Sequence, residues 1–205
     1  MKTIWPAITL VLGLQIAFRS TTSGQGTFTY DQQSSTEAFP GETGSIIQQS
    51  QPIGQSFTPG FSEVGFVRLR LADVGFTSLG ATLFINLRSD SITGAVLSAS
   101  APVDIPNGFG LSTNGYVNFF FTNAIPVTAG LTYFFQPIVQ IGDPVQLGGH
   151  NGFGYAGGMA YVLGAPITPN DFWFREGTYN VPEPSSVSLV LIGFGALIHR
   201  RKRFV

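Results

Sequence analysis

Apolar and polar side chains alternate most strictly in one short segment of the chain. Val67, Leu69 and Leu71 alternate there with Arg68 and Arg70. A period of two is the signature of a β-strand that buries one face, and it places the two guanidinium groups in solvent. The segment is therefore predicted to be a half-buried strand.

A hairpin is predicted directly after this strand. Residues 82–88 repeat the alternation, the turn-forming residues 89–91 follow, and 95–99 are again largely apolar. Two alternating runs around a short Ser/Asp turn are typical of neighbouring antiparallel strands.

Later segments are denser in aromatic residues. Phenylalanine occurs on both faces of 116–121 and 131–141, which predicts central strands that are covered on both sides. Pro137 cannot donate a ladder hydrogen bond, so it predicts a bulge or an edge. We expect the last strand over 171–179.

These segments together predict the fold class. Clusters of Gly, Pro, Asn and Asp separate them at intervals typical of sandwiches, and no stretch of the body shows helical spacing of apolar residues over three turns. We therefore predict an all-β fold, an antiparallel β-sandwich of jelly-roll type with about eight strands.

Composition restricts the functional classes. Charged residues make up 10% of the 205 residues, and the chain has 26 Gly, 13 Pro and no Cys. The charged fraction lies far below the usual value of about 25%, which argues against an all-helical enzyme. Without cysteine there is no disulfide, no thiolate metal site and no Cys nucleophile.

The N-terminus is predicted to be a secretory signal peptide, residues 1–24. Lys2 precedes the apolar stretch 4–18, and small polar residues follow. Thr22 and Gly24 would supply the small residues before the cleavage point, which places the mature N-terminus near Gln25. The alternative is a buried N-terminal element, but no strand alternation or helix cap precedes this stretch.

The C-terminal segment, 181–205, combines three unlike elements. They are a Pro-Glu-Pro motif (Pro182, Glu183, Pro184), an apolar run (187–198) and a basic tail (Arg200, Arg201, Lys202, Arg203). A helix over 185–199 would rise about 22 Å, short of the roughly 30 Å hydrocarbon layer unless flanking side chains snorkel. The basic tail favours a single membrane helix whose end stays cytoplasmic. The alternative is a C-terminal core helix with a basic tail.

This C-terminal segment resembles the PEP-CTERM sorting signal of exported bacterial proteins. The resemblance covers about 25 residues and implies that exosortase, a membrane-embedded transpeptidase-like enzyme, is a partner, and that the carrier is linked to extracellular polysaccharide and biofilm. Fragments such as 54–58, 129–133 and 171–175 also resemble the all-β ectodomains, sometimes called choice-of-anchor domains, that precede such signals. The apolar run is short for the family. The resemblance implies a division into signal peptide (1–24), β-sandwich ectodomain (25–180) and sorting segment (181–205).

The body is acidic once its two ends are set aside. Between Gln25 and Val181 the chain has four arginines, ten acidic residues and no lysine, a net charge of −6. Nucleic-acid binding needs clustered cations, so it is not expected. Anionic polysaccharide would be repelled unless cations bridge it.

No catalytic residues are predicted. His150 is the only histidine of the body and has no activated serine or spaced metal ligand beside it. The glycines of 152–157 match G-x-G-x-x-G, but no helix start follows them. Asp171 and Glu176 could serve as paired carboxylates of a glycosidase, yet five positions apart on one strand they would face opposite sides.

Two binding possibilities stay open. Calcium is a possible ligand, since loop Asp residues and carbonyl oxygens could hold it, but no D-x-D-x-D loop is present. Asp90, Asp104 and Asp143 fit turns in which an Asp caps its own backbone. Exposed aromatic rings could stack on sugars, and Tyr155, Tyr161 and Trp173 are the candidates. Trp173 lies between two phenylalanines, so one of these faces must be core.

The sequence therefore predicts an exported, non-catalytic cell-surface or extracellular-matrix protein. It is first anchored in the membrane through the C-terminal helix, then sorted through Pro182, Glu183 and Pro184. A carbohydrate-binding module is the first alternative and a glycan-degrading enzyme the second.

Overall fold

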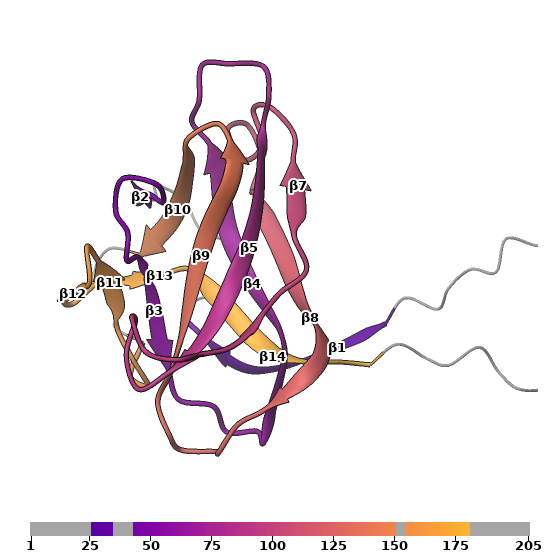
Figure 1. Cartoon of the computed structure of the whole chain (residues 1–205), viewed down its shortest axis with the longest axis vertical. Helices are drawn as coiled ribbons and strands as arrows, with labels where there is room; N and C mark the ends of the chain where they lie inside the picture. Colours follow the sequence, from indigo (N-terminus) through magenta and orange to yellow (C-terminus); the bar gives the residue numbers. More distant parts are fainter. Residues whose placement is uncertain (1–25, 35–42, 151–154, 181–205) are drawn as a thin grey trace, which may run out of the picture. The chain divides into compact units, whose positions relative to one another are not determined.

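A computed structural model describes residues 26–34, 43–150 and 155–180 of the chain (Figure 1). The predicted signal peptide, the sorting segment 181–205 and residues 152–154 of the glycine motif lie outside the described residues, as does the side chain of His150. The description below concerns the body, Thr27–Asn180.

Within the described residues every regular element is a β-strand, and the strands form two antiparallel sheets (Figure 1). The first sheet contains β1 (Thr27–Gln33), β2 (Gly44–Ile46), β4 (Glu63–Asp73), β8 (Tyr116–Pro126), β10 (Val145–His150), β13 (Asp171–Phe172) and β14 (Phe174–Asn180). The second contains β3 (Gly54–Phe57), β5 (Ala81–Ser89), β6 (Val96–Ala99), β7 (Val103–Ile105), β9 (Tyr133–Gly142), β11 (Ala160–Val162) and β12 (Ala165–Ile167). The predicted all-β class is confirmed, and the two sheets have the arrangement of a β-sandwich.

The core lies between the inner faces of the sheets. Leu69 and Leu71 of β4 are fully buried in one cluster with Leu83 and Ile85 of β5 and Phe135 of β9. Alternation along β4 and β5 therefore points the apolar face of each strand at the other sheet, as their sequences predict. The predicted hairpin is also confirmed, because β5 pairs antiparallel with β6.

Pro137 lies in β9, the central strand between β3 and β5. Beside it the ladder to β3 has already ended, because β3 pairs only with residues 133–135. The Pro137 carbonyl instead accepts a hydrogen bond from Gln51 Nε2 at 2.8 Å. The N and O of a strand residue point to the same side, so the missing N–H also falls at this local edge, as predicted.

The prediction of a central strand over 116–121 is wrong. Among the described strands, β8 pairs only with β4. Its phenylalanines occupy both faces for another reason, since Phe120 belongs to an aromatic layer on the outer face of the sheet. The Phe28 ring lies 5.0 Å from Phe66 and 4.8 Å from Tyr179, and Phe120 lies 4.8 Å from Tyr179. The layer covers Phe66 completely.

The arginines of β4 are also less exposed than predicted. Arg68 is half-buried on this outer face, with its guanidinium carbon 5.3 Å from the Tyr116 ring centre and its Nη1 3.1 Å from the Tyr30 hydroxyl. Stacking on rings lets a guanidinium group lose much of its water while keeping favourable electrostatics. The outer face is thus a second packed layer.

The last predicted strand is divided in two. Residues 171–172 pair with β10, whereas β14 pairs with β1 and β4. Trp173 forms the break, and its N–H donates to the Gly148 carbonyl at 2.9 Å. Phe172 and Phe174, on either side of this break, both lie in the core.

Candidate functional site

The two ends of the body meet at one end of the sandwich. Thr27 of β1 pairs with Asn180 of β14, and Gly177 pairs with Phe66 near the start of β4. The eleven residues of β4 then lead to Asp73 at the opposite end, a distance of roughly 35 Å at about 3.3 Å per residue. We call that opposite end, formed by loops 74–80 and 106–115 and the turn at 143–144, the distal tip.

Two buried aspartates hold the loops of the distal tip. Asp73 accepts hydrogen bonds from the N–H groups of Gly75 at 3.0 Å and Gly108 at 2.8 Å, one on each carboxylate oxygen. Asp143 accepts from the Thr77 hydroxyl, and its N–H donates to the Gly80 carbonyl at 2.8 Å. Each aspartate joins segments from different parts of the sequence, so the tip is held in place by the sandwich.

Apolar side chains are presented to solvent on this framework. Phe76 is fully exposed, and Leu79 and Ile141 are 77% and 72% exposed. Scattered exposed apolar residues are ordinary, but Leu79 and Ile141 line one cleft, and Phe76 lies in the same loop as Leu79.

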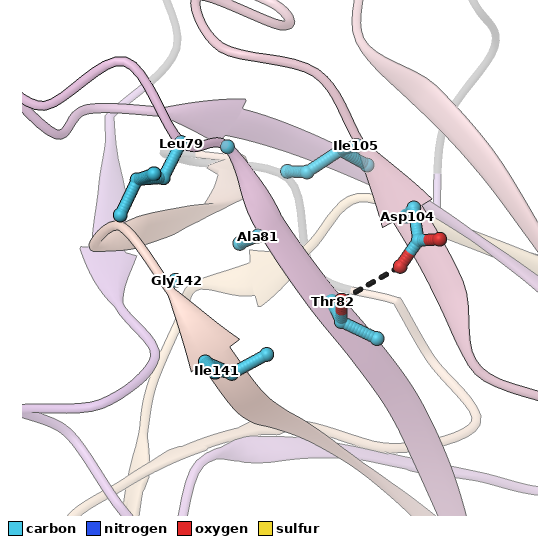
Figure 2. Close-up of a pocket in the computed structure, with 8 residues that line it drawn as sticks. Leu79, Ala81, Thr82, Asp104, Ile105, Ile141 and Gly142 are labelled. Atoms are coloured by element: carbon cyan, nitrogen blue, oxygen red, sulfur yellow. Dashed lines mark hydrogen bonds between the residues drawn. The ribbon is translucent and has the colours of Figure 1, made fainter.

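The cleft beside them has a volume of about 260 Å³ (Figure 2). Ile141, Thr82 and Asp104 lie in one row across β9, β5 and β7, because Thr82 pairs with both of the others. Asp104 lies in a strand and not in the predicted turn, and its Oδ1 accepts a hydrogen bond from Thr82 Oγ1 at 2.6 Å. Figure 2 shows this pair on one side of the cleft and Leu79 and Ile141 on the other. The cleft thus offers an aliphatic wall and a carboxylate that accepts hydrogen bonds.

The three predicted sugar-contacting rings do not form a row. Trp173 is fully buried, with its ring 4.4 Å from that of Tyr116, so it has no free face for a sugar. Tyr161 is half-buried and packs edge-on against Phe134 at 5.6 Å. Tyr155 packs edge-on against the core ring of Phe174 at 5.1 Å. Each ring serves packing in a different place, which corrects the prediction for Trp173.

Tyr155 lies close to three acidic residues, Asp31, Asp171 and Glu176, whose proximity was not predicted from the sequence. Its hydroxyl donates to Gln32 Oε1 at 2.8 Å, and its backbone N–H donates to Asp171. Burial, with added repulsion from Glu176, Asp31 and Asp171, raises the pKa of Tyr155 to about 12. Asp31, Asp171 and Glu176 thus all act on Tyr155, although they come from three different strands, β1, β13 and β14.

Glu176 is the most unusual of these groups. Its side chain is fully buried on the inner face of β14, between Val67 of β4 and Gln32 of β1. Burial first, and then the charge of Asp31, raise the pKa of Glu176 to about 9. The carboxyl group is therefore neutral at neutral pH, and it can donate its proton to Asp31 in a hydrogen bond.

The comparisons with known proteins give no family. No protein-family model matches the chain, and no curated protein matches it. Within the described part of the chain, no three His, Asp or Glu residues are grouped closely enough to hold a metal ion. The same residues include no apolar helix long enough to cross a membrane.

Proposed function

We propose that this chain is an exported, non-catalytic cell-surface or matrix protein, built on a sandwich of jelly-roll type and sorted through its C-terminal segment. The observation that supports it best is the separation of the chain ends from the distal tip along β4. A body held through the residues after Asn180 presents its apolar tip on the far side. Attachment and contact then take place at opposite ends of one rigid sandwich.

In this proposal Pro182, Glu183 and Pro184 are the residues that exosortase reads. The apolar run 187–198 holds the chain in the bilayer, and the basic residues 200–203 keep the tail from crossing. Because β14 pairs with β4 up to Gly177 and with β1 up to Asn180, cleavage after the body leaves the sandwich whole.

Sorting is tested by intact mass measurement of the exported protein from cells with and without exosortase. The expected product from exosortase-containing cells lacks residues 200–203. Replacing Pro182, Glu183 and Pro184 together by alanine is expected to leave the basic tail on the protein. Pro102→Ala, at an exposed proline of the body, is the control and should be processed normally. A wild-type product that still carries the tail contradicts the proposal.

One observation favours the carbohydrate-binding alternative, though at a different place from the one the sequence suggested. The distal tip combines an exposed ring, Phe76, with aliphatic Leu79 and Ile141 and the carboxylate of Asp104. Apolar surfaces can pack on the C–H face of a sugar, and a carboxylate accepts hydrogen bonds from hydroxyl groups. The body carries a net charge of −6, so a neutral glycan is the matching ligand.

A glycan array that includes neutral and uronate polymers tests this alternative with the exported protein. We expect a neutral glycan to bind, and Phe76→Ala and Asp104→Asn each to weaken binding about tenfold. Leu163→Ala changes another exposed apolar residue, in the β11–β12 turn, and should bind normally. Binding that Phe76→Ala and Asp104→Asn leave unchanged, or binding of uronates alone, argues against the tip as the contact surface.

A further inference from the structure

The first strand of the body lies at one edge of its sheet. Among the described strands β1 pairs only with β14. Its ladder is interrupted at Asp31, which is the extra residue between the pairs Tyr30–Gly177 and Gln32–Glu176. A bulge leaves one residue out of the ladder and turns its side chain toward a new partner.

Asp31 uses that position to hold the loop between β3 and β4. Its Oδ2 accepts hydrogen bonds from the N–H groups of Gly60 at 2.6 Å and Phe61 at 2.8 Å, and its Oδ1 accepts one from Gln32 Nε2 at 3.1 Å. A carboxylate that receives three N–H donors is stabilised as an anion. Asp31 is therefore the member of the pair that N–H donors surround.

Glu176, in contrast, is stabilised in its neutral form. It is completely buried, and the backbone N–H of Gln32 favours its carboxylate form less than burial and the neighbouring Asp31 oppose it. As a carboxylic acid it donates one hydrogen bond to Asp31.

The other groups around Glu176 do not supply a compensating positive charge. β1 contributes Asp31 and the amide of Gln32, and β4 contributes the apolar Val67. Tyr155 and, beyond it, Asp171 are neutral or negative. The neighbouring arginine of β14, Arg175, stacks on Tyr30 and Trp173 on the outer face of the sheet.

We propose that the Asp31–Glu176 carboxyl pair is a proton-operated latch that fastens strand β1 and the β3–β4 loop to β14. The latch is closed while the pair holds its proton. Opening transfers one proton from the Glu176 carboxyl group to water and leaves two carboxylates, which then separate. Because β1 is an edge strand, its release presents the free N–H and C=O groups of β14, the kind of edge that accepts an added strand. The proposal does not depend on the proposed function.

The sign of the pH effect follows from the proton count. In the closed state Glu176 keeps its proton up to about pH 9, whereas an exposed Glu loses it near 4.5. Between these values opening releases a proton, so the fraction of molecules with β1 open rises about tenfold per pH unit and levels off above about 9. Acid closes the latch and neutral to alkaline pH loosens it.

Hydrogen exchange of the exported full chain between pH 5 and 10, corrected for the intrinsic exchange rate, tests this proposal. We expect the protection of β1 amides to fall about tenfold per pH unit to about pH 9, while β1 stays less protected than the core strands β5 and β9. Glu176→Gln, a neutral side chain of the same shape, should make β1 protection independent of pH in this range. Tyr155→Phe removes the hydrogen bond to Gln32 and should lower β1 protection at every pH, but the fall per pH unit should stay, because Tyr155 ionises only near pH 12.

Asp31→Asn provides a second variant should Glu176→Gln fail to fold. It removes a negative neighbour of Glu176, so the levelling-off should move to a pH below 9. Three results would overturn the latch. They are β1 protection that does not change from pH 5 to 9, the same fall in Glu176→Gln as in the wild type, and β1 and core amides that exchange with one common protection throughout.

Discussion

Phe135→Ala is expected to lower the free energy of unfolding of the body by about 3–5 kcal/mol. Phe135 is fully buried in central strand β9. Its ring centre lies 5.3 Å from Phe174 of β14 and 6.2 Å from Phe57 of β3. It therefore joins both sheets, and truncation leaves a cavity that the surrounding β-ladders cannot easily fill.

The matched control is a Phe→Ala substitution at a fully exposed position. Phe76→Ala removes an identical side chain that is fully exposed at the distal tip, so its effect on stability should stay within about 0.5 kcal/mol. Chemical denaturation of the two variants beside the wild type measures both effects. Similar losses in the two variants would show that Phe135 does not occupy the core position described here. The pair also separates stability from contact, because only Phe76 belongs to the proposed contact surface.

The sequence predicts those features of the fold that depend on neighbouring residues. Alternation along 67–71 and 82–88 identifies the faces of β4 and β5, and the lost N–H of Pro137 identifies a local edge. Each of these inferences needs only the two-residue period of a strand or the chemistry of one residue. These inferences hold because each strand of a two-layer sandwich buries one face, and alternation of apolar and polar residues predicts that face.

Other features depend on which strands become neighbours. Phenylalanine on both faces of 116–121 suggests a central strand, but β8 has an aromatic layer outside it that β1 and β14 supply. The layer brings together Phe28 and Tyr179, from the two ends of the body. No local period carries that information, because it arises only from the pairing of the first strand with the last.

The candidate sites also depend on which strands become neighbours, and so the sequence alone does not predict them. Tyr155, Tyr161 and Trp173 are close in sequence, yet each packs in a different place. Asp31 and Glu176 are 145 positions apart and meet through one bulge in the β1–β14 ladder. The distal tip likewise combines Leu79, Asp104 and Ile141, whose neighbours in sequence give no sign of a shared cleft. An acid at an inward-facing position of a strand, such as Glu176 two residues after Phe174, is the one local signal that could have drawn attention to the pair.

The same carboxyl pair makes the global stability of the protein depend on pH. The folded state holds the Glu176 pKa at about 9, against the ordinary 4.5. The stabilising contribution of the neutral acid is fully present below about pH 4.5 and is lost as the pH rises to about 9. Where the folded state binds one more proton than the unfolded state, stability falls by up to about 1.4 kcal/mol per pH unit.

Comparison of the wild type with Glu176→Gln isolates this contribution. Every other titrating group is common to both proteins, so the difference in their free energies of unfolding reports Glu176 alone. Denaturant titrations at pH 5, 6, 7 and 8 should show the wild type losing stability relative to the variant at each step, by about 1.4 kcal/mol per unit. Parallel curves would mean that Glu176 titrates alike in the folded and unfolded chains. A difference that opens in the reverse direction would mean that a positive partner keeps Glu176 ionised, in which case the pair would be an ion-binding site and no latch.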